Sequence, residues 1–250
     1  MFRARGARRY AGDMATAHET WHVAPHRPLA QLSTNVWKLE GDLERTPLKR
    51  VMTIAKREDG GLVVHSAIAV DKPTMTAITT LGDVRAIVVP NAYHRLDARV
   101  FHARFPEAQV VCPAGARKAV EQIVPVTATY DDAPSDAVVE LQTLDGTKAR
   151  EGVMIVRDSA GTTLVFNDLV FNMPHVGGAM GFALRHITGS SGGPRITRIA
   201  RLFLIHDKRA VRAHLERLAA LPGLLRIIVS HHEVIEHDPG GVLAELASEL

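Results

Sequence analysis

Three apolar runs in this sequence each end in side chains that can bind a metal ion or transfer a proton. They lead to Asn91 and His94 after residues 87–89, to Asp168 after 164–167, and to His231 and His232 after 227–230. Because the carboxyl ends of strands in an open α/β architecture meet at a shared crevice, we expect these side chains to converge on one site. Imidazoles beside a carboxylate suit a divalent metal ion or a general-base pair. The sequence therefore predicts an enzyme or a descendant of one.

Each candidate also has a purely structural interpretation. His94 and Asp97 stand three apart where a helix is expected to begin, but a helix cap beside a surface histidine gives the same pattern. Asp168 lies among apolar residues, where a carboxylate needs a cation or several donors, although a turn also accommodates an aspartate. His65 ends another apolar run and is interpreted as a core or rim histidine.

Composition favours one compact domain. The chain has 250 residues, 46% of them hydrophobic, which is enough for one sizeable core. Its formal charge of +3 is carried by the first thirteen residues, so the charge gives no support to a nucleic-acid partner. The single cysteine, Cys112, excludes internal disulfides, and no apolar run reaches the roughly 18 residues of a membrane span. We expect a cytoplasmic protein with neither a nucleic-acid nor a membrane partner.

The order of the expected elements points to an α/β fold of two similar halves, each with strands followed by helices. The first half has strands at 35–39, 50–55, 62–65, 84–89 and 109–112, and helices after residue 71, at 94–105 and at 113–123. The second has strands at 138–143, 153–157, 162–166 and 224–229, and helices at 195–204, 208–220 and 241–250. Residues 1–30 are expected to form a basic, disordered extension, and residues 31–250 the domain.

A glycine-bearing segment at 171–194 is too long for a simple connection. Its glycines ease changes of backbone conformation, and its Met and Phe residues supply apolar contacts. We expect a lid over the crevice that brings His175 or His186 near Asp168. The alternative is an excursion that packs on the flank of the domain or on a second subunit.

Together these motifs resemble those of the metallo-β-lactamase superfamily, which includes the hydroxyacylglutathione hydrolases. In that family an apolar strand runs into T-H-x-H-x-D-H, at the place that residues 90–96 take in this chain. Residues 166–171 are similar to the family's G-D-x-x-F segment, whose aspartate bridges two metal ions, and residues 229–232 to its terminal S-H-G. The resemblance implies an αββα sandwich from about Asn35 to Leu250, with Asp168 and His231 as metal ligands.

The chain departs from the family pattern at most of the ligands. His94 is offset by one from a ligand position, and only a local loop shift would bring it into the site. Two zinc ions normally need about seven protein ligands, so we expect one divalent ion, zinc or iron, or none. The expected ligands are His94, Asp168, His231 and Asn91, the last as a weak oxygen ligand or as a partner of the ligands. The departures are Asn91 at the first histidine of the motif, Tyr93 at the second, Arg95 at the aspartate, Leu96 at the last histidine, and Gly146-Thr147-Lys148 in place of G-H-T.

The expected function is that of a metallo-hydrolase in which a metal-bound water attacks a small ester or thioester. Asp168 and His231 are the expected catalytic residues, and His175 and His232 are expected to bind the substrate. One alternative is a non-catalytic relative that has lost the metal site and binds a ligand or partner in the crevice. The sequence leaves a homo-oligomer open.

A third interpretation is hydrolysis without a metal. It would use His94 with Asp97, or Ser230 with a histidine, as nucleophile or base. The G-x-S-x-G turn that usually presents a nucleophilic serine is absent from the sequence.

Overall fold

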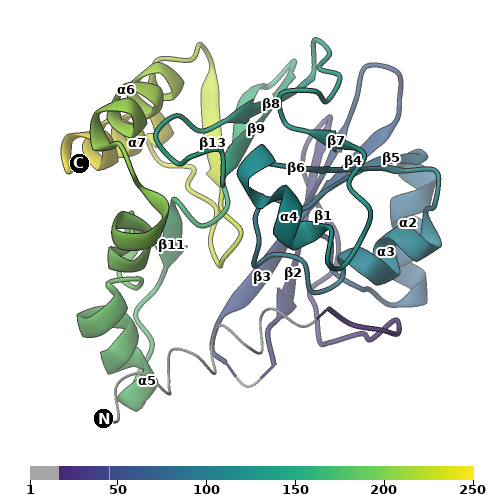
Figure 1. The fold of residues 1–250 in the computed structure, drawn as a ribbon, viewed down its shortest axis with the longest axis horizontal. Coiled ribbons are helices and arrows are strands. Elements are labelled where there is room, and N and C mark those ends of the chain that lie inside the picture. The colour runs from purple at the N-terminus through teal and green to yellow at the C-terminus, as the bar shows by residue number, and fades with distance from the viewer. Residues whose placement is uncertain (1–16, 45) are drawn as a thin grey trace.

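The computed structural model describes residues 17–44 and 46–250 as two β-sheets packed face to face, with helices on both outer sides (Figure 1). Each sheet is therefore apolar on both faces, since the other sheet covers one face and helices cover the other. This is the αββα sandwich that the sequence predicts.

The first sheet has seven strands that follow one another in sequence order. They are β1 (Ala30–Ser33), β2 (Val36–Asp42), β3 (Lys49–Lys56), β4 (Leu62–His65), β5 (Val84–Val88), β6 (Gln109–Cys112) and β7 (Ala128–Thr129). Pairing is antiparallel from β1 to β4 and parallel from β4 to β7. Parallel strands end at the same edge of a sheet, so the residues that follow β4 and β5 lie close together there.

Helices cover the outer face of this sheet. They are α2 (Lys72–Leu81), α3 (Ala98–Arg104) and α4 (Arg117–Val120), with the short 3-10 helix η1 (Ala114–Ala116) before α4. The Asp71 carboxylate accepts the N–H of Thr74 at 2.9 Å and so caps α2, as Asp followed by Pro73 predicts. Phe101 of α3 belongs to the same apolar cluster as Ile78 of α2, which attaches both helices to the sheet.

The second sheet has four strands in the order β13-β10-β9-β8. They are β8 (Val139–Thr143), β9 (Gly152–Asp158), β10 (Gly161–Val165) and β13 (Leu224–Ile228). Neighbours among β8, β9 and β10 are antiparallel, whereas β13 runs parallel to β10. The carboxyl ends of β10 and β13 therefore lie at one edge, and Asp168 and His231 follow these two ends.

Alternation along β9 assigns its side chains to two different layers. Met154 and Val156 belong to the core between the sheets, while Val153 and Ile155 pack under the outer helices with Leu215. Fully burying such a side chain stabilises the fold by about 1.5–3 kcal/mol. A register shift of one residue would exchange the side chains of the central core with those under the outer helices, so the register of β9 is strongly specified. The outer helices on this side are α6 (Lys208–Ala219) and α7 (Pro239–Ser248).

The segment expected to be a lid folds into short elements on one flank of the sandwich (Figure 1). They are β11 (Phe171–Met173), α5 (Gly178–Ala183), the π-helix η2 (Leu184–Thr188) and β12 (Gly193–Arg195), followed by a second π-helix, η3 (Ala200–Leu204). β11 and β12 pair antiparallel, which closes the excursion at its base. The helix expected from residue 195 therefore starts later, because residue 195 is part of β12.

The described part of the N-terminal segment packs against the domain. Ala17 is buried, and Trp21 Nε1 donates to the carbonyl oxygen of Val70 at 2.9 Å. The Trp21 ring also stacks on Phe101, with 5.4 Å between centroids. The domain boundary expected at residue 31 is therefore too late. Residues 1–16, on which most of the expected basic extension falls, lie outside the described residues.

Candidate metal centre

Asp168 lies just beyond β10, and Glu151 determines the direction in which it leaves the sheet. The backbone N–H of Asp168 donates to Oε1 of Glu151, and the N–H of Leu169 donates to the same oxygen at 3.2 Å. Glu151 is fully buried directly before β9. Its carboxyl group satisfies two backbone donors that the end of β10 leaves outside the sheet. The Asp168 side chain keeps 24% of its surface exposed and points toward two histidines.

A turn that begins at Asn91 positions His94. The Asn91 side-chain oxygen accepts the N–H groups of Tyr93 at 2.8 Å and of His94 at 3.0 Å, which is an Asx turn. This turn occupies residues that were expected to be helical, so α3 begins only at Ala98. It places Nδ1 of His94 3.2 Å from Oγ of Ser66 and Nε2 against Asp168.

His231 follows β13 and is held by the backbone of β3. Its Nδ1 lies 2.8 Å from the carbonyl oxygen of Lys49. Because a carbonyl oxygen only accepts hydrogen bonds, Nδ1 carries the proton and Nε2 presents a lone pair. The Phe171 ring stacks on the imidazole, with 4.9 Å between centroids. Both contacts direct Nε2 toward His94 and Asp168.

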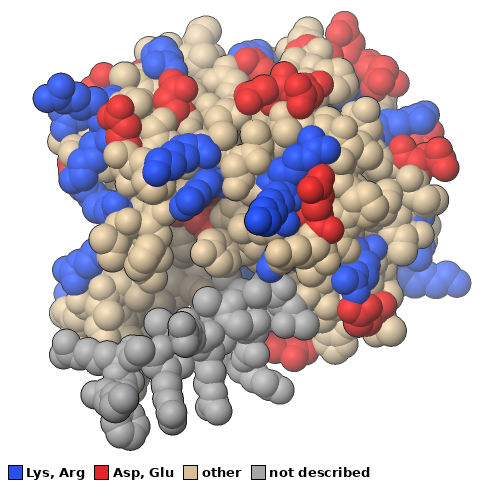
Figure 2. Space-filling model, in the orientation of Figure 1, with Lys and Arg blue, Asp and Glu red and all other residues tan. Residues whose placement is uncertain are grey.

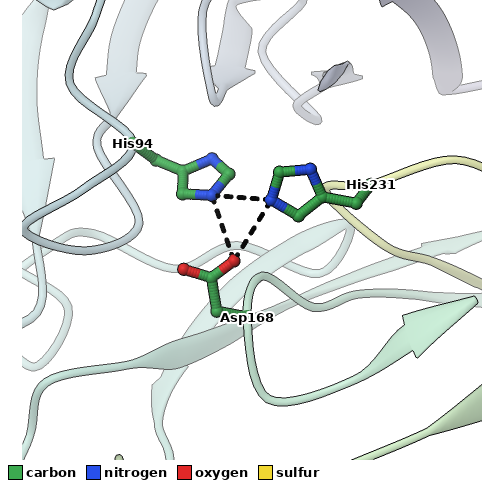
Figure 3. A group of neighbouring side chains, drawn as sticks. All are labelled: His94, Asp168 and His231. Carbon is green, nitrogen blue, oxygen red and sulfur yellow. Dashed lines mark hydrogen bonds and ion pairs between the residues drawn. The ribbon is translucent and has the colours of Figure 1, made fainter. Parts of the chain in front are cut away.

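The three ligand atoms form a nearly equilateral triangle (Figure 3). His94 Nε2 is 3.1 Å from Asp168 Oδ1 and 3.2 Å from His231 Nε2, and His231 Nε2 is 3.3 Å from Asp168 Oδ1. Tetrahedral coordination with bonds of about 2.0–2.1 Å separates neighbouring ligand atoms by about 3.3 Å. Two imidazole nitrogens and one carboxylate oxygen are donors that zinc and iron(II) both accept. The residues therefore fit one such ion, and within 17–44 and 46–250 they are the one group of this kind.

The electrostatics of the triangle favour a cation. Although burial by itself raises the pKa of a carboxyl group, His94 and His231 hold the pKa of Asp168 well below its usual range. Burial lowers the pKa of His94, and the charge of Asp168 offsets this only in part. At neutral pH an ionised carboxylate thus faces a neutral His94. An ionised carboxylate beside two imidazole nitrogens is stabilised by a shared proton or by a metal ion.

A small pocket adjoins the triangle. It is lined by Arg50, Tyr93, His94, Leu96 and His231. Arg50 is buried and donates to Asp97 Oδ2 at 2.7 Å and to the carbonyl oxygen of Ala67 at 2.8 Å. Asp97 thus neutralises the one formal charge on the wall, and it also lies 2.8 Å from Nδ1 of His18.

Asn91 does not offer the oxygen that the sequence interpretation assigned to the metal. That oxygen accepts two backbone N–H groups, while Nδ2 donates to Oδ2 of Asp168 at 2.6 Å. The amide orientation follows from these donors, because only oxygen can accept from both N–H groups. Asn91 therefore holds the Asp168 side chain and directs no free oxygen at the triangle. The same hydrogen bond occupies the second oxygen of Asp168, which would otherwise be the atom to bridge to a second ion.

The two histidines expected to bind substrate do not line the pocket. His175 is exposed, and its Nδ1 lies 3.1 Å from Oγ of Ser191 within the excursion itself. His232 is also absent from the pocket wall, and its Nε2 accepts the N–H of Lys49 at 3.4 Å. Burial lowers the pKa of His232 to about 4. Of the segment 171–194, Phe171 contacts the triangle.

The pairs required for hydrolysis without a metal are not formed. Asp97 is bonded to Arg50 and His18, whereas His94 faces Asp168. Ser230 Oγ donates to the carbonyl oxygen of Phe166 at 3.4 Å, so no histidine activates it. The helix begins only at Ala98, after both residues, so the helical spacing that would place His94 and Asp97 on one face is absent.

Sequence reasoning missed two residues that shape the site. Glu151 directly precedes a strand and is buried completely, and Arg50 occupies a strand position that is 7% exposed. A charged residue at a position that the strand pattern predicts to be buried is the signal that both share. No short motif marks either residue.

No family model and no curated protein matches the sequence. Solved structures do match the fold. DIM-1 metallo-β-lactamase exposed to ceftazidime superposes with a TM-score of 0.60 at 12% identity, over 91% of this chain and 99% of that one. A metallo-β-lactamase from Erythrobacter litoralis gives 0.59 at 15% identity, over 89% and 96%.

A third solved structure also matches the fold. FIM-1 from Pseudomonas aeruginosa, a metallo-β-lactamase solved in its mono-zinc form, gives a TM-score of 0.56 at 13% identity, over 91% of this chain and 96% of that one. Identities this low establish shared architecture and leave activity to be argued from the site. All three proteins span nearly the whole chain with the same two-sheet sandwich. The chain therefore has the metallo-β-lactamase fold.

Proposed function

We propose that the protein is a hydrolase of small esters or thioesters that uses one divalent metal ion, zinc or iron(II), held by His94, Asp168 and His231. The observation that carries this proposal is the convergence of three ligand atoms, 3.1 to 3.3 Å apart, from three distant parts of the chain. The fold adds support, because its matched structures include an enzyme with a single zinc ion.

A bound divalent ion would supply Lewis acidity, which polarises a carbonyl group and lowers the pKa of a water molecule. The residues of this chain orient the ligands. His231 keeps its proton on Nδ1 through the Lys49 carbonyl group, and Asn91 and Glu151 hold the side chain and the backbone of Asp168. Such contacts behind the ligands commonly change metal affinity 10–100-fold when they are removed.

The pocket restricts what can react. It is a small pocket, and five residues form its wall. Leu96 gives the wall an apolar part, and Tyr93, which is 53% exposed, stands at the rim. Since Asp97 neutralises Arg50, the wall offers no free charge to a carboxylate or phosphate. A short, uncharged acyl group fits this pocket best.

The test is hydrolysis of short-chain esters, thioesters and a β-lactam by protein purified without a polyhistidine tag, stripped of metal and reloaded with zinc or iron(II). We expect turnover of at least one ester or thioester that depends on metal, and a loss of about a thousandfold in kcat/KM for His231→Gln. His232→Gln is the matched control, because that neighbouring side chain neither belongs to the triangle nor lines the pocket. Equal activity with and without metal would refute the proposal. Metal binding without any turnover would favour a relative that only binds its ligand.

A further inference from the structure

Large apolar side chains are exposed mainly on one segment of the molecule. Within the described residues, most of the exposed large apolar side chains lie on α5, η2 and η3 or directly before η3, and five of them have exposed fractions from 52% to 71%. They are Phe182, Ile187, Ile199, Leu202 and Phe203. We call the exposed surface of α5, η2 and η3 the flank face. Side chains of this size usually pack inside a protein or against a partner.

The charge of the same segment has one sign. Residues 169–206 contain four arginines and neither aspartate nor glutamate. Arg201 is paired with Glu249 at 2.6 Å, and Arg195 donates to backbone carbonyl groups. Arg185 and Arg198 are exposed, and in the described part of the chain no carboxylate lies within ion-pair distance of either. In Figure 2 tan surface lies beside blue side chains at the left of the molecule, above the grey atoms.

The combination of apolar and basic groups indicates the occupant. A lipid bilayer with anionic headgroups accepts apolar side chains at the boundary of its acyl region and attracts nearby arginines. A second copy of the chain is a poorer match, since a two-fold contact through this face would bring the arginines of both copies together without a carboxylate between them. We propose that the flank face docks the protein on the surface of bilayers that contain anionic lipids.

This inference differs from the expectation that the protein has no membrane partner. That expectation rests on the length of apolar runs, and the structure agrees in one respect: none of the described helices is long and apolar enough to cross a bilayer. Docking at the surface of a bilayer needs no long apolar run of sequence. It needs apolar side chains on one face, and here the short helices at 178–188 and 200–204 supply them.

The experiment is co-sedimentation of the full chain with vesicles of phosphatidylcholine alone or mixed with phosphatidylglycerol. We expect binding to the mixed vesicles only, weakening as salt is added. The double variant Leu202→Gln/Phe203→Gln should bind about a hundredfold more weakly, because two side chains no longer enter the lipid. Arg185→Gln should weaken binding about fivefold. Leu202, Phe203 and Arg185 are all exposed, so circular dichroism should show that both variants are folded.

Leu225→Gln is the matched control, since Leu225 is 36% exposed on β13 and lies outside the flank face. It should bind as the wild type does. Equal binding to both kinds of vesicle, or binding that the double variant retains, would overturn the proposal. The second result would assign vesicle binding to another basic part of the chain, such as residues 1–16. A wild-type dimer that the double variant converts to a monomer, without vesicle binding, would show that the face pairs two copies.

Discussion

Replacing Asn91 tests how the triangle is held together. Asn91→Ala removes two hydrogen bonds to backbone N–H groups and one to the ionised Asp168 carboxylate. At about 1 kcal/mol for each of the first two and about 1.5–3 kcal/mol for the charged one, the free energy of unfolding should fall by about 3–5 kcal/mol. Urea denaturation of the metal-free protein at pH 7 measures this. Zinc affinity, measured by competition with a chelator, should fall about 10–100-fold.

Asn91→Asp separates the two parts of this effect. Its carboxylate still accepts from Tyr93 and His94, but the donor that lay 2.6 Å from Asp168 becomes a second acceptor. Two carboxylates this close share a proton more readily than either holds one alone, so the pKa of the pair rises on folding. The metal-free variant should therefore gain stability relative to wild type as the pH falls from 7 to 5. If Asn91→Ala were as stable as the wild type, or if Asn91→Asp gained no stability relative to the wild type as the pH falls, this reasoning would be refuted.

Two further predictions concern buried groups beneath the site. Burial, with a smaller contribution from His94, lowers the pKa of His65 to about 3. Only the unfolded chain then takes up that proton just below pH 6.5, so His65 should account for about 2 kcal/mol of the stability that the wild type loses from pH 7 to 5, and His65→Leu should lack this part in urea titrations. Burial, and then the charge of Asp168, raises the pKa of Glu151 well above its usual range. The free energy of unfolding of Glu151→Gln should thus lie within about 1 kcal/mol of the wild-type value at pH 7. That of Glu151→Ala should fall by about 2–5 kcal/mol, because two N–H groups lose their acceptor. Equal losses in the two variants would contradict this.

The strands were predictable where local signals agree with the tertiary structure. Residues 62–65 follow a turn with two glycines and are rich in β-branched side chains, and the observed β4 has the expected bounds. Residues 109–112 likewise match β6. The expected helix at 94–105 started too early, because Asn91 caps a turn that serves the site and the helix begins at Ala98. In the excursion at 171–194, glycine-rich sequence gave no periodicity from which α5 and η2 could be assigned.

The site was predictable only where a strand end carries the ligand. Asp168 and His231 follow β10 and β13, so the topology alone brings them to one edge. His94 needed the loop shift that the Asx turn supplies, and a motif comparison cannot provide that shift. Glu151 and Arg50 became evident only from their burial, which depends on how the two sheets pack. Whether His94, Asp168 and His231 bind metal stays a prediction.

The most direct test of the central claim is the metal content of protein purified without a polyhistidine tag and equilibrated with zinc, measured by elemental analysis. The account predicts one equivalent per chain. It also predicts that Asp168→Asn and His231→Gln lose this equivalent, while His232→Gln keeps it. Two equivalents in the wild type, or one equivalent that survives both ligand substitutions, would contradict a single ion held at the triangle of His94, Asp168 and His231.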